Sequence, residues 1–208
     1  MQEGVTELLA IAALYVSGVV LPGPNFVATL HRAVTRPRSE ALALVGGIAL
    51  VNMLWALAAV GGVVAVFAAA PWLFLTIKLA GAAYLLWLAV GLWRGAKSPL
   101  APVAQSSGRG LLAAFRAGVL INLGNAKALI FFASIFAAAL PAAPSFWLSA
   151  SIVLVVGTIA CLWYGGLALL LSFGGAAAAY RRAKPWIDRI CGLFLAGFGA
   201  RLVAQELR

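Results

Sequence analysis

Charged residues are scarce in this chain, and acidic residues are scarcer still. Only 10% of the 208 residues are charged, while 64% are hydrophobic. A soluble globular domain carries about 25% charged residues, so this composition excludes an ordinary soluble protein. The mean hydropathy of +1.06 predicts instead an all-α integral membrane protein, because apolar runs of about 20 residues cross a bilayer as helices.

Carboxylates are absent from the centres of the apolar runs. All five acidic residues lie near the ends of runs, at Glu3, Glu7, Glu40, Asp188 and Glu206. A bound metal ion, or the second positive charge of a lysine-like substrate, needs carboxylate partners inside the membrane. We therefore expect no metal site and favour a neutral substrate over a basic one.

Motifs of catalysis and of redox chemistry are missing as well. The two cysteines, Cys161 and Cys191, have no C-x-x-C spacing, and packing roles are expected for them. The chain has a single histidine, His31, and neither a G-x-S-x-G nor an H-E-x-x-H motif. We expect no catalytic residue and no cofactor, so an enzyme is disfavoured.

Six apolar runs long enough to span a bilayer fill most of the chain, at about residues 5–30, 41–68, 72–93, 112–139, 146–172 and 187–205. Eleven of the fifteen basic residues lie in or beside the connections on one side: Arg32, Arg36, Arg38, Arg94, Lys97, Arg109, Arg116, Arg181, Arg182, Lys184 and Arg189. The positive-inside rule makes this side cytoplasmic. It predicts a multi-pass protein of the cytoplasmic (inner) membrane with both termini outside, which is the periplasmic side if the host is a Gram-negative bacterium. The net charge of +10 then reports orientation rather than nucleic-acid binding.

The first run is interrupted by Leu21-Pro22-Gly23-Pro24-Asn25. The two prolines remove two backbone donors, and Gly23 loosens the turn between them. Irregular backbone survives at membrane depth only where it is buried or lines a cavity, and interrupted helices recur in secondary transporters. The motif therefore predicts a break that contacts substrate, with a simple proline kink as the alternative.

The two halves of the chain echo each other. The interruption in the first run has a counterpart at Asn122-Leu123-Gly124-Asn125, and Pro71-Trp72 has one at Pro185-Trp186. A repeat of three spans crosses the membrane an odd number of times, so its two copies have opposite orientations. We predict one transmembrane domain over residues 1–208, made of two inverted three-helix repeats at about 1–96 and 110–208 with a linker at 97–109.

These motifs resemble those of the LysE/RhtB family of amino acid exporters over essentially the whole chain. The matching segments are Pro22-Gly23-Pro24-Asn25, Gly46-Gly47, Lys78-Leu79-Ala80-Gly81-Ala82-Ala83-Tyr84-Leu85, Asn125-Ala126-Lys127, and the glycines Gly192, Gly197 and Gly199. The resemblance implies a secondary transporter that exports small amino acids of the threonine, homoserine or leucine type, driven by the proton gradient. Ala126 replaces the second-half proline of the family, so we expect a milder break there.

The predicted substrate-binding residues combine the first break with polar side chains inside the runs. Lys78 and Lys127 are the ionisable residues well inside spans, although Lys78 can instead snorkel to the outer interface and Lys127 can bind free carbonyls. Side-chain amides both donate and accept hydrogen bonds, but a buried amide also serves as an interhelical contact. The set is Pro22, Gly23, Pro24, Asn25, Lys78, Asn122, Asn125 and Lys127, with Asn52 and Tyr84 as secondary members.

Several alternatives stay open at this point. A cation or metal exporter of the same architecture, and a membrane assembly protein without transport activity, are the rival functions. Coupling to protons and uncoupled export are both open; His31, Glu40 and Asp188 are the titratable candidates near the cytoplasmic surface, and buried Lys78 or Lys127 are others. The expected partners are the bilayer, the amino acid and protons, and a homo-oligomer is compatible with the sequence.

Overall fold

The computed structural model describes residues 2–21, 23–69, 71–98, 109–141, 143–171 and 176–206, and for some helical residues, Lys78 among them, it describes the backbone only. These residues contain eight α-helices, and no strand occurs among them. The helices are α1 (Gln2–Val20), α2 (Pro24–Thr35), α3 (Arg38–Ala69), α4 (Pro71–Gly95), α5 (Leu111–Leu123), α6 (Ala126–Ala139), α7 (Phe146–Leu171) and α8 (Ala176–Glu206). The all-α prediction is confirmed.

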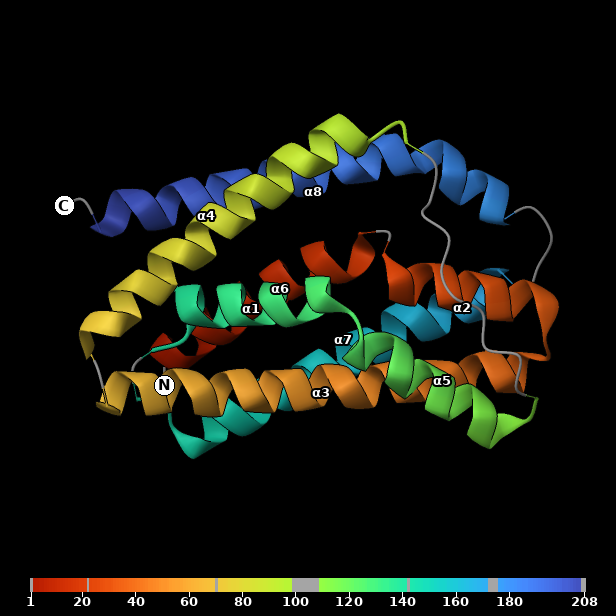
Figure 1. The fold of residues 1–208 in the computed structure, drawn as a ribbon, viewed down its shortest axis with the longest axis horizontal. Coiled ribbons are helices and arrows are strands. Elements are labelled where there is room, and N and C mark those ends of the chain that lie inside the picture. Colours follow the sequence, from red (N-terminus) through yellow and green to blue (C-terminus); the bar gives the residue numbers. More distant parts are fainter. Residues whose placement is uncertain are drawn as a thin grey trace.

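The helices lie side by side along the long axis of the molecule (Figure 1). Both chain termini lie at one end, together with the α3–α4 connection. The α2–α3 connection, the end of α4, the start of α5 and the start of α8 lie at the other end (Figure 1). We call these the terminal end and the connection end. This alternation is what successive membrane crossings require.

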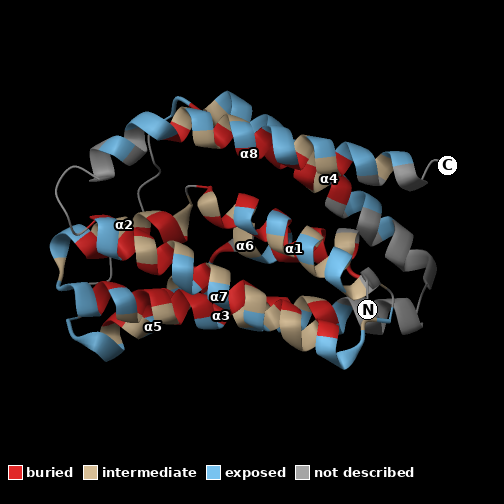
Figure 2. Cartoon of the chain, turned by 180° about the vertical axis from the view of Figure 1, so that it is seen from behind, coloured by how far each residue is buried: buried red, intermediate tan, exposed pale blue. Residues whose placement is uncertain are grey.

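Two groups of helices make up the molecule. The long helices α4 and α8 pack against each other and form one layer, seen along the top of Figure 2. In the other group α3 packs on both α5 and α7, while α1 and α2 pack on α7. Helix α6 contacts both α3 and α4 and so joins the two groups. The buried faces of both groups point inward (Figure 2).

Two helices in the described part are long and apolar enough to cross a membrane on their own: α3, over Arg38–Gly62, and α7, over Phe146–Leu171. The pairs α1–α2 and α5–α6 pass the same test as bent pairs, which raises the number of spans to as many as four. The third and sixth predicted spans are present as the helices α4 and α8. Their arrangement in two inverted repeats stays a prediction.

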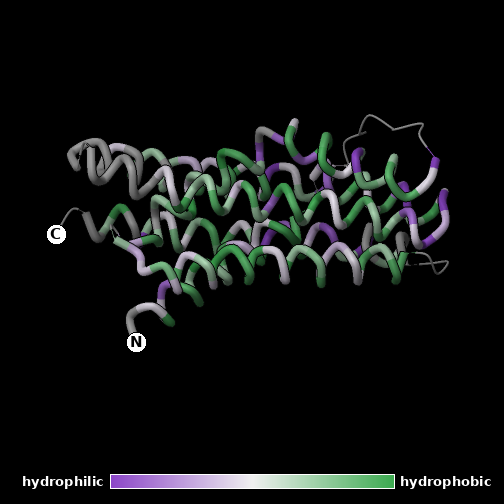
Figure 3. The backbone as a smooth tube through the Cα atoms, turned by 90° about the horizontal axis from the view of Figure 1, so that it is seen from below, coloured by the Kyte–Doolittle hydropathy of each residue, from purple (hydrophilic) through white to green (hydrophobic). Residues whose placement is uncertain are grey.

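Large apolar side chains cover the outside of the bundle. Examples that are 62–71% exposed are Trp87, Leu120, Leu154, Leu162 and Leu170. A soluble monomer rarely leaves so much apolar surface in water, whereas lipid tails are as apolar as leucine. Hydrophilic residues gather at the connection end of the molecule (Figure 3). The surface therefore fits a protein embedded in a bilayer with one strongly polar end.

The start of α8 differs from the predicted span. The sequence places the sixth span at 187–205 and Asp188 near the cytoplasmic surface, but α8 begins at Ala176 and continues through Pro185. Asp188 therefore lies more than three turns inside a continuous helix at 3.6 residues per turn, and only 2% of it is exposed. The sequence did not predict this burial, while the position of Asp188 near the cytoplasmic surface stays a prediction. The first turns of α8 are polar, so the hydropathy of the sequence did not indicate that they belong to the helix.

Candidate functional site

The break between α1 and α2 is formed by local backbone chemistry. Gly23 caps α2 in an extended conformation, and Pro24 occupies the first turn, where its missing N–H removes no helical hydrogen bond. The two helices form a bent pair with an angle of 56°. The predicted interruption of the first span is confirmed in shape, although Pro22 itself lies outside the described residues.

A second break separates α5 from α6. Gly124 caps the end of α5, and the Asn125 side chain caps α6 by accepting a hydrogen bond from the Ala128 N–H at 3.3 Å. The bend is 61°, so the expectation of a milder break at Ala126 is wrong. Asparagine is one of the preferred N-cap residues, so α6 starts at this break without the proline.

A network of side-chain amides connects the helices that meet at the two breaks. Asn122 accepts a hydrogen bond from Asn25 Nδ2, and its own Nδ2 donates to Asn52 Oδ1 and to the Ile48 carbonyl, each at 2.9 Å. These contacts connect α2, α3 and α5. Asn122 is fully buried and both of its N–H donors are used, so it holds the other amides in place.

A cavity lies next to both breaks. The space between its lining atoms is about 430 Å³, a volume that includes the open side of the cavity. Its polar lining is Asn25, Asn52, Asn125, Lys127, Tyr15 and Tyr164, and its remaining lining is Gly18, Val19, Leu21, Gly23, Ala128, Phe131 and Phe132. Neither Asp nor Glu occurs among these lining residues. Helices α1, α2, α3, α6 and α7 thus contribute to one site.

Lys127 brings a positive charge to this cavity from the first turn of α6. A Cβ added at Gly23 would lie 3.9 Å from Lys127 Nζ, which places the amine directly at the α1–α2 break. A cation beside two helix N-termini adds to their positive partial charges. This part of the cavity is therefore built to attract an anionic group.

Two buried polar atoms among the lining side chains have no hydrogen-bond partner in the described structure. They are Asn25 Oδ1 and the Tyr15 hydroxyl, on residues that are 5% and 3% exposed. The Tyr164 hydroxyl, in contrast, interacts with the Asn25 side chain. Buried polar groups are nearly always paired, so unpaired groups beside a cavity are candidates for contact with a ligand.

Comparison with known proteins places this geometry in a family. The sequence model of the LysE type translocator family matches residues 16–206 of this chain. The chain belongs to this family. The resemblance inferred from the sequence motifs is thereby confirmed. No solved structure matches the chain.

Relatives of this translocator include named efflux proteins. It is 32% identical over 208 residues to the threonine efflux protein of Escherichia coli (strain K12), which covers 95% of this chain and 98% of that protein. It is 34% identical over 207 residues to the threonine efflux protein of Salmonella typhi, with coverage of 94% and 97%. Over 64 residues, 30% of each chain, it is 42% identical to the homoserine/homoserine lactone efflux protein of Salmonella typhi.

The structure of the translocator brings most of the predicted site residues together. Gly23, Asn25, Asn52, Asn125 and Lys127 all line the cavity. Pro24 starts α2 beside it, and Asn122 lies one hydrogen bond behind it through Asn25. Tyr84 is half-buried against Trp87, with ring centroids 5.6 Å apart, and does not line this cavity. The side chain of Lys78 lies outside the described residues.

Sequence reasoning missed the aromatic wall of the cavity. Tyr15 and Tyr164 each place a hydroxyl in an apolar helix, and Phe131 and Phe132 follow one turn after Lys127. Tyrosine is rare here, with four in the whole chain. A tyrosine hydroxyl inside an apolar run could have indicated a lining residue. Tyrosines in such runs serve helix packing just as often, so the sequence did not distinguish the two roles.

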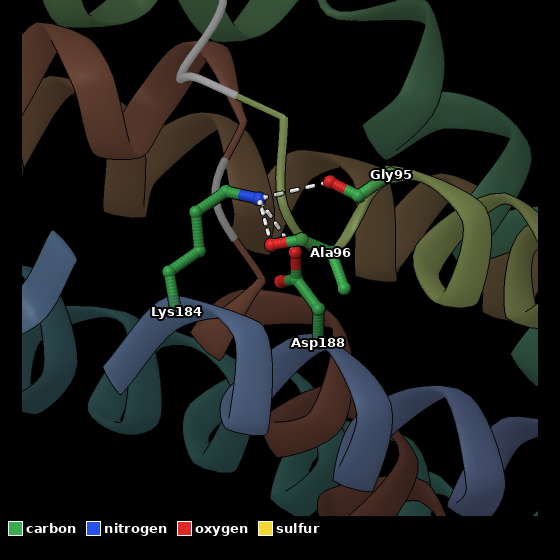
Figure 4. Close-up of polar contacts among 4 residues, drawn as sticks. All are labelled: Gly95, Ala96, Lys184 and Asp188. Atoms are coloured by element: carbon green, nitrogen blue, oxygen red, sulfur yellow. Dashed lines mark hydrogen bonds and ion pairs between the residues drawn. The ribbon is translucent and has the colours of Figure 1, made fainter. Parts of the chain in front are cut away.

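Two buried ion pairs lie toward the connection end. Lys184 Nζ contacts Asp188 Oδ2 at 2.7 Å and donates to the Gly95 and Ala96 carbonyls at the end of α4 (Figure 4). Arg32 pairs with Glu40 at 3.3 Å, and Glu40 Oε1 accepts from the Gly110 N–H at 3.0 Å. The first pair joins α8 to α4, and the second joins α2, α3 and the start of α5.

Proposed function

We propose that this chain exports a small neutral amino acid across the bacterial cytoplasmic membrane, of the threonine or homoserine type. The family and the printed names of its efflux relatives support amino acid export. The narrower choice of a neutral substrate rests on the charges of the cavity.

One observation carries the proposal: Lys127 and the unpaired Asn25 Oδ1 line the same cavity at the two helix breaks. Every free amino acid has a carboxylate and an ammonium group close together. The carboxylate fits Lys127 and the helix N-termini, since these carry positive charge. The ammonium is a donor and fits the amide oxygen of Asn25.

The absence of Asp and Glu from the described lining favours a neutral side chain. A lysine or arginine substrate would bring a second positive charge into a low-dielectric site that already holds Lys127. An unpaired charge in such a place is strongly unfavourable. Likewise, the described residues contain no cluster of three or more His, Cys, Asp or Glu side chains, so no observation favours the metal-exporter alternative.

Part of the helix packing supports two inverted repeats in which α1–α2, α3 and α4 correspond to α5–α6, α7 and α8, although the α4–α6 and α2–α3 contacts have no counterpart of similar extent in the described structure. Several contacts occur in matching pairs. Helix α1 packs on α7 as α5 packs on α3, helix α2 packs on α7 as α6 packs on α3, and α1 meets α6 as α5 meets α2. The two breaks also have nearly equal bends. Transporters built in this way bind substrate between their broken helices, where the cavity lies.

Asp188 is our proposed site of proton coupling. It is buried, its Oδ1 has no hydrogen-bond partner in the described structure, and it lies within electrostatic range of Lys127. Its other oxygen, Oδ2, is paired with Lys184 at 2.7 Å, so a change of charge at Asp188 would act on both lysines.

The proposal is tested by efflux from proteoliposomes that contain the purified protein and are loaded with labelled threonine, lysine or Mn²⁺. We expect rapid efflux of threonine, faster when a proton gradient is imposed, and background rates for lysine and Mn²⁺. Lys127→Met should reduce threonine efflux at least about tenfold, the effect of losing one charge-assisted contact. Lys97→Met, at an exposed position, is the matched control.

The variant is informative only when it folds, so its elution profile in detergent and its melting temperature are measured alongside. Rapid threonine efflux by folded Lys127→Met would contradict the role of the amine. Efflux of Mn²⁺ without efflux of threonine would support the metal-exporter alternative instead.

A further inference from the structure

Tyr15 is the least explained polar residue of the cavity. It lies on α1 and lines the same cavity as the amides and the lysine of the two breaks. Only 3% of it is exposed, and its hydroxyl has no hydrogen-bond partner in the described structure. Its ring packs against Phe132 with centroids 5.4 Å apart, and Val19 and Phe131 complete this apolar part of the lining.

A hydroxyl in such surroundings costs stability that phenylalanine would avoid. Burying a polar group without a partner is unfavourable, and replacing it with an apolar group of the same shape is neutral or stabilising. The ring alone would suffice for the contact with Phe132. The hydroxyl is therefore explained best by a partner that is present only when the cavity is occupied.

The side chains that line the cavity are of two chemical kinds. Asn25, Asn125 and Lys127 supply the groups that match a backbone carboxylate and ammonium, whereas Tyr15 and the two phenylalanines form the wall that remains for the side chain. Within this wall, the Tyr15 hydroxyl is the polar atom without a partner. A substrate side chain that both fits the aromatic wall and satisfies this atom must be small and must itself carry a hydrogen-bonding group.

We propose that Tyr15 selects amino acids with a side-chain hydroxyl, such as threonine, by exchanging a hydrogen bond between its own hydroxyl and that of the substrate. This inference rests on the proposed function, because it assumes an amino acid in the cavity. A hydroxyl both donates and accepts, so two hydroxyls can always satisfy each other. Valine has the shape of threonine but leaves the Tyr15 hydroxyl unpaired, and sites that bind a substrate hydroxyl discriminate strongly against an analogue without it.

The experiment compares threonine with valine in proteoliposomes that contain wild-type protein, Tyr15→Phe or Tyr84→Phe. Threonine and valine differ by one hydroxyl, as do tyrosine and phenylalanine. We expect the wild type to prefer threonine over valine by at least about tenfold in initial efflux rate, the ratio that one lost hydrogen bond to a buried group produces. In Tyr15→Phe the preference should fall to within about threefold, mainly because threonine now brings an unpaired hydroxyl. Tyr84→Phe, whose ring lies against Trp87 outside the lining, should keep the wild-type preference.

The outcomes separate this inference from the proposed function. Efflux of neither amino acid by the wild type refutes the proposed function. Equal efflux of both by the wild type refutes the inference alone and leaves export intact, and it does so without any variant. A folded Tyr15→Phe that keeps the full threonine preference also refutes the inference. We expect this variant to melt at or above the wild-type temperature, because it removes an unpaired buried hydroxyl.

Discussion

Under the proposed function, the polar residues around the cavity divide into candidates for contact with the substrate and residues that hold these candidates in place. Lys127 and Asn25 line the cavity with unused charge or acceptor capacity. Asn122 does not line it, yet it joins Asn25, Asn52 and the Ile48 carbonyl in one network. A buried amide that is fully committed to neighbours fixes geometry rather than contacting a mobile ligand.

At this scale we predict that Asn122→Leu destabilises the protein more than Asn25→Leu does. Leucine has a similar volume but leaves Asn25 Nδ2 and Asn52 Oδ1 without this partner, and each unpaired buried group costs about 1–3 kcal/mol. It also removes the second hydrogen bond of the Ile48 carbonyl, which keeps its bond within α3. Asn25→Leu affects fewer groups, namely Asn122 Oδ1 and the Tyr164 hydroxyl. Thermal unfolding in detergent measures the difference, and equal melting temperatures would contradict a holding role for Asn122.

Sequence alone placed both asparagines in the site but could not assign these roles. An amide at a helix break is recognisable in the sequence, because the break is a local feature. Whether the side chain faces the cavity or a neighbouring helix depends on how α2, α3 and α5 pack. Lys184 and Asp188 show the same limit: their spacing of four residues on one helix predicts a pair, but not its burial against the end of α4.

Helices in the core meet at glycines where the backbones come very close. A Cβ at Gly47 of α3 would collide with the Phe115 carbonyl oxygen and would lie 2.9 Å from the Val119 nitrogen, both on α5. A Cβ at Gly118 of α5 would in turn collide with the Leu44 carbonyl oxygen of α3. Small residues allow this approach inside membranes. The crossing positions Asn52 and Asn122 for their hydrogen bond.

At the scale of elements we predict that Gly47→Ala is disruptive and that the adjacent Gly46→Ala is tolerated. Alanine at 47 must push α3 and α5 apart, and overpacking of this kind costs about 1–3 kcal/mol. Alanine at 46 meets only the Phe115 ring, at 3.7 Å, an ordinary contact. Melting temperature and threonine efflux should both fall for Gly47→Ala but not for Gly46→Ala. Similar values for the two variants would show that α3 and α5 can move apart without cost and would contradict the prediction.

The whole molecule is polarised from end to end. Both termini lie at one end, and hydrophilic residues gather at the other (Figures 1 and 3). Because eleven of the fifteen basic residues belong to the connections on one side, the positive-inside rule predicts that the connection end is cytoplasmic. The lining from α1 and α6 (Tyr15, Gly18, Phe131 and Phe132) lies on the side of the breaks that faces the terminal end.

At this scale we predict that a thiol introduced by Ser98→Cys is protected from labelling from outside, while one introduced by Ala143→Cys is labelled. Both positions are exposed, Ser98 just after the end of α4 and Ala143 before α7. The background carries Cys161→Ser and Cys191→Ser, since both native thiols are free. A membrane-impermeant maleimide on intact cells makes the measurement. Labelling of the Ser98→Cys variant but not of the Ala143→Cys variant would reverse the orientation.

Membership of the membrane class, the positions of the helix breaks and the basic end were all determined by the sequence itself. Each depends on local composition or on residues adjacent in the chain, such as Gly23 and Pro24 or Gly124 and Asn125. Only the tertiary structure decided that α8 starts early enough to bury Asp188, that the second break is as sharp as the first, and that Tyr15 and Asn25 keep unpaired atoms beside one cavity. A hydrogen bond between residues 97 positions apart, like that of Asn25 with Asn122, exists only once the helices have packed, and the same packing decides which polar groups remain for a substrate.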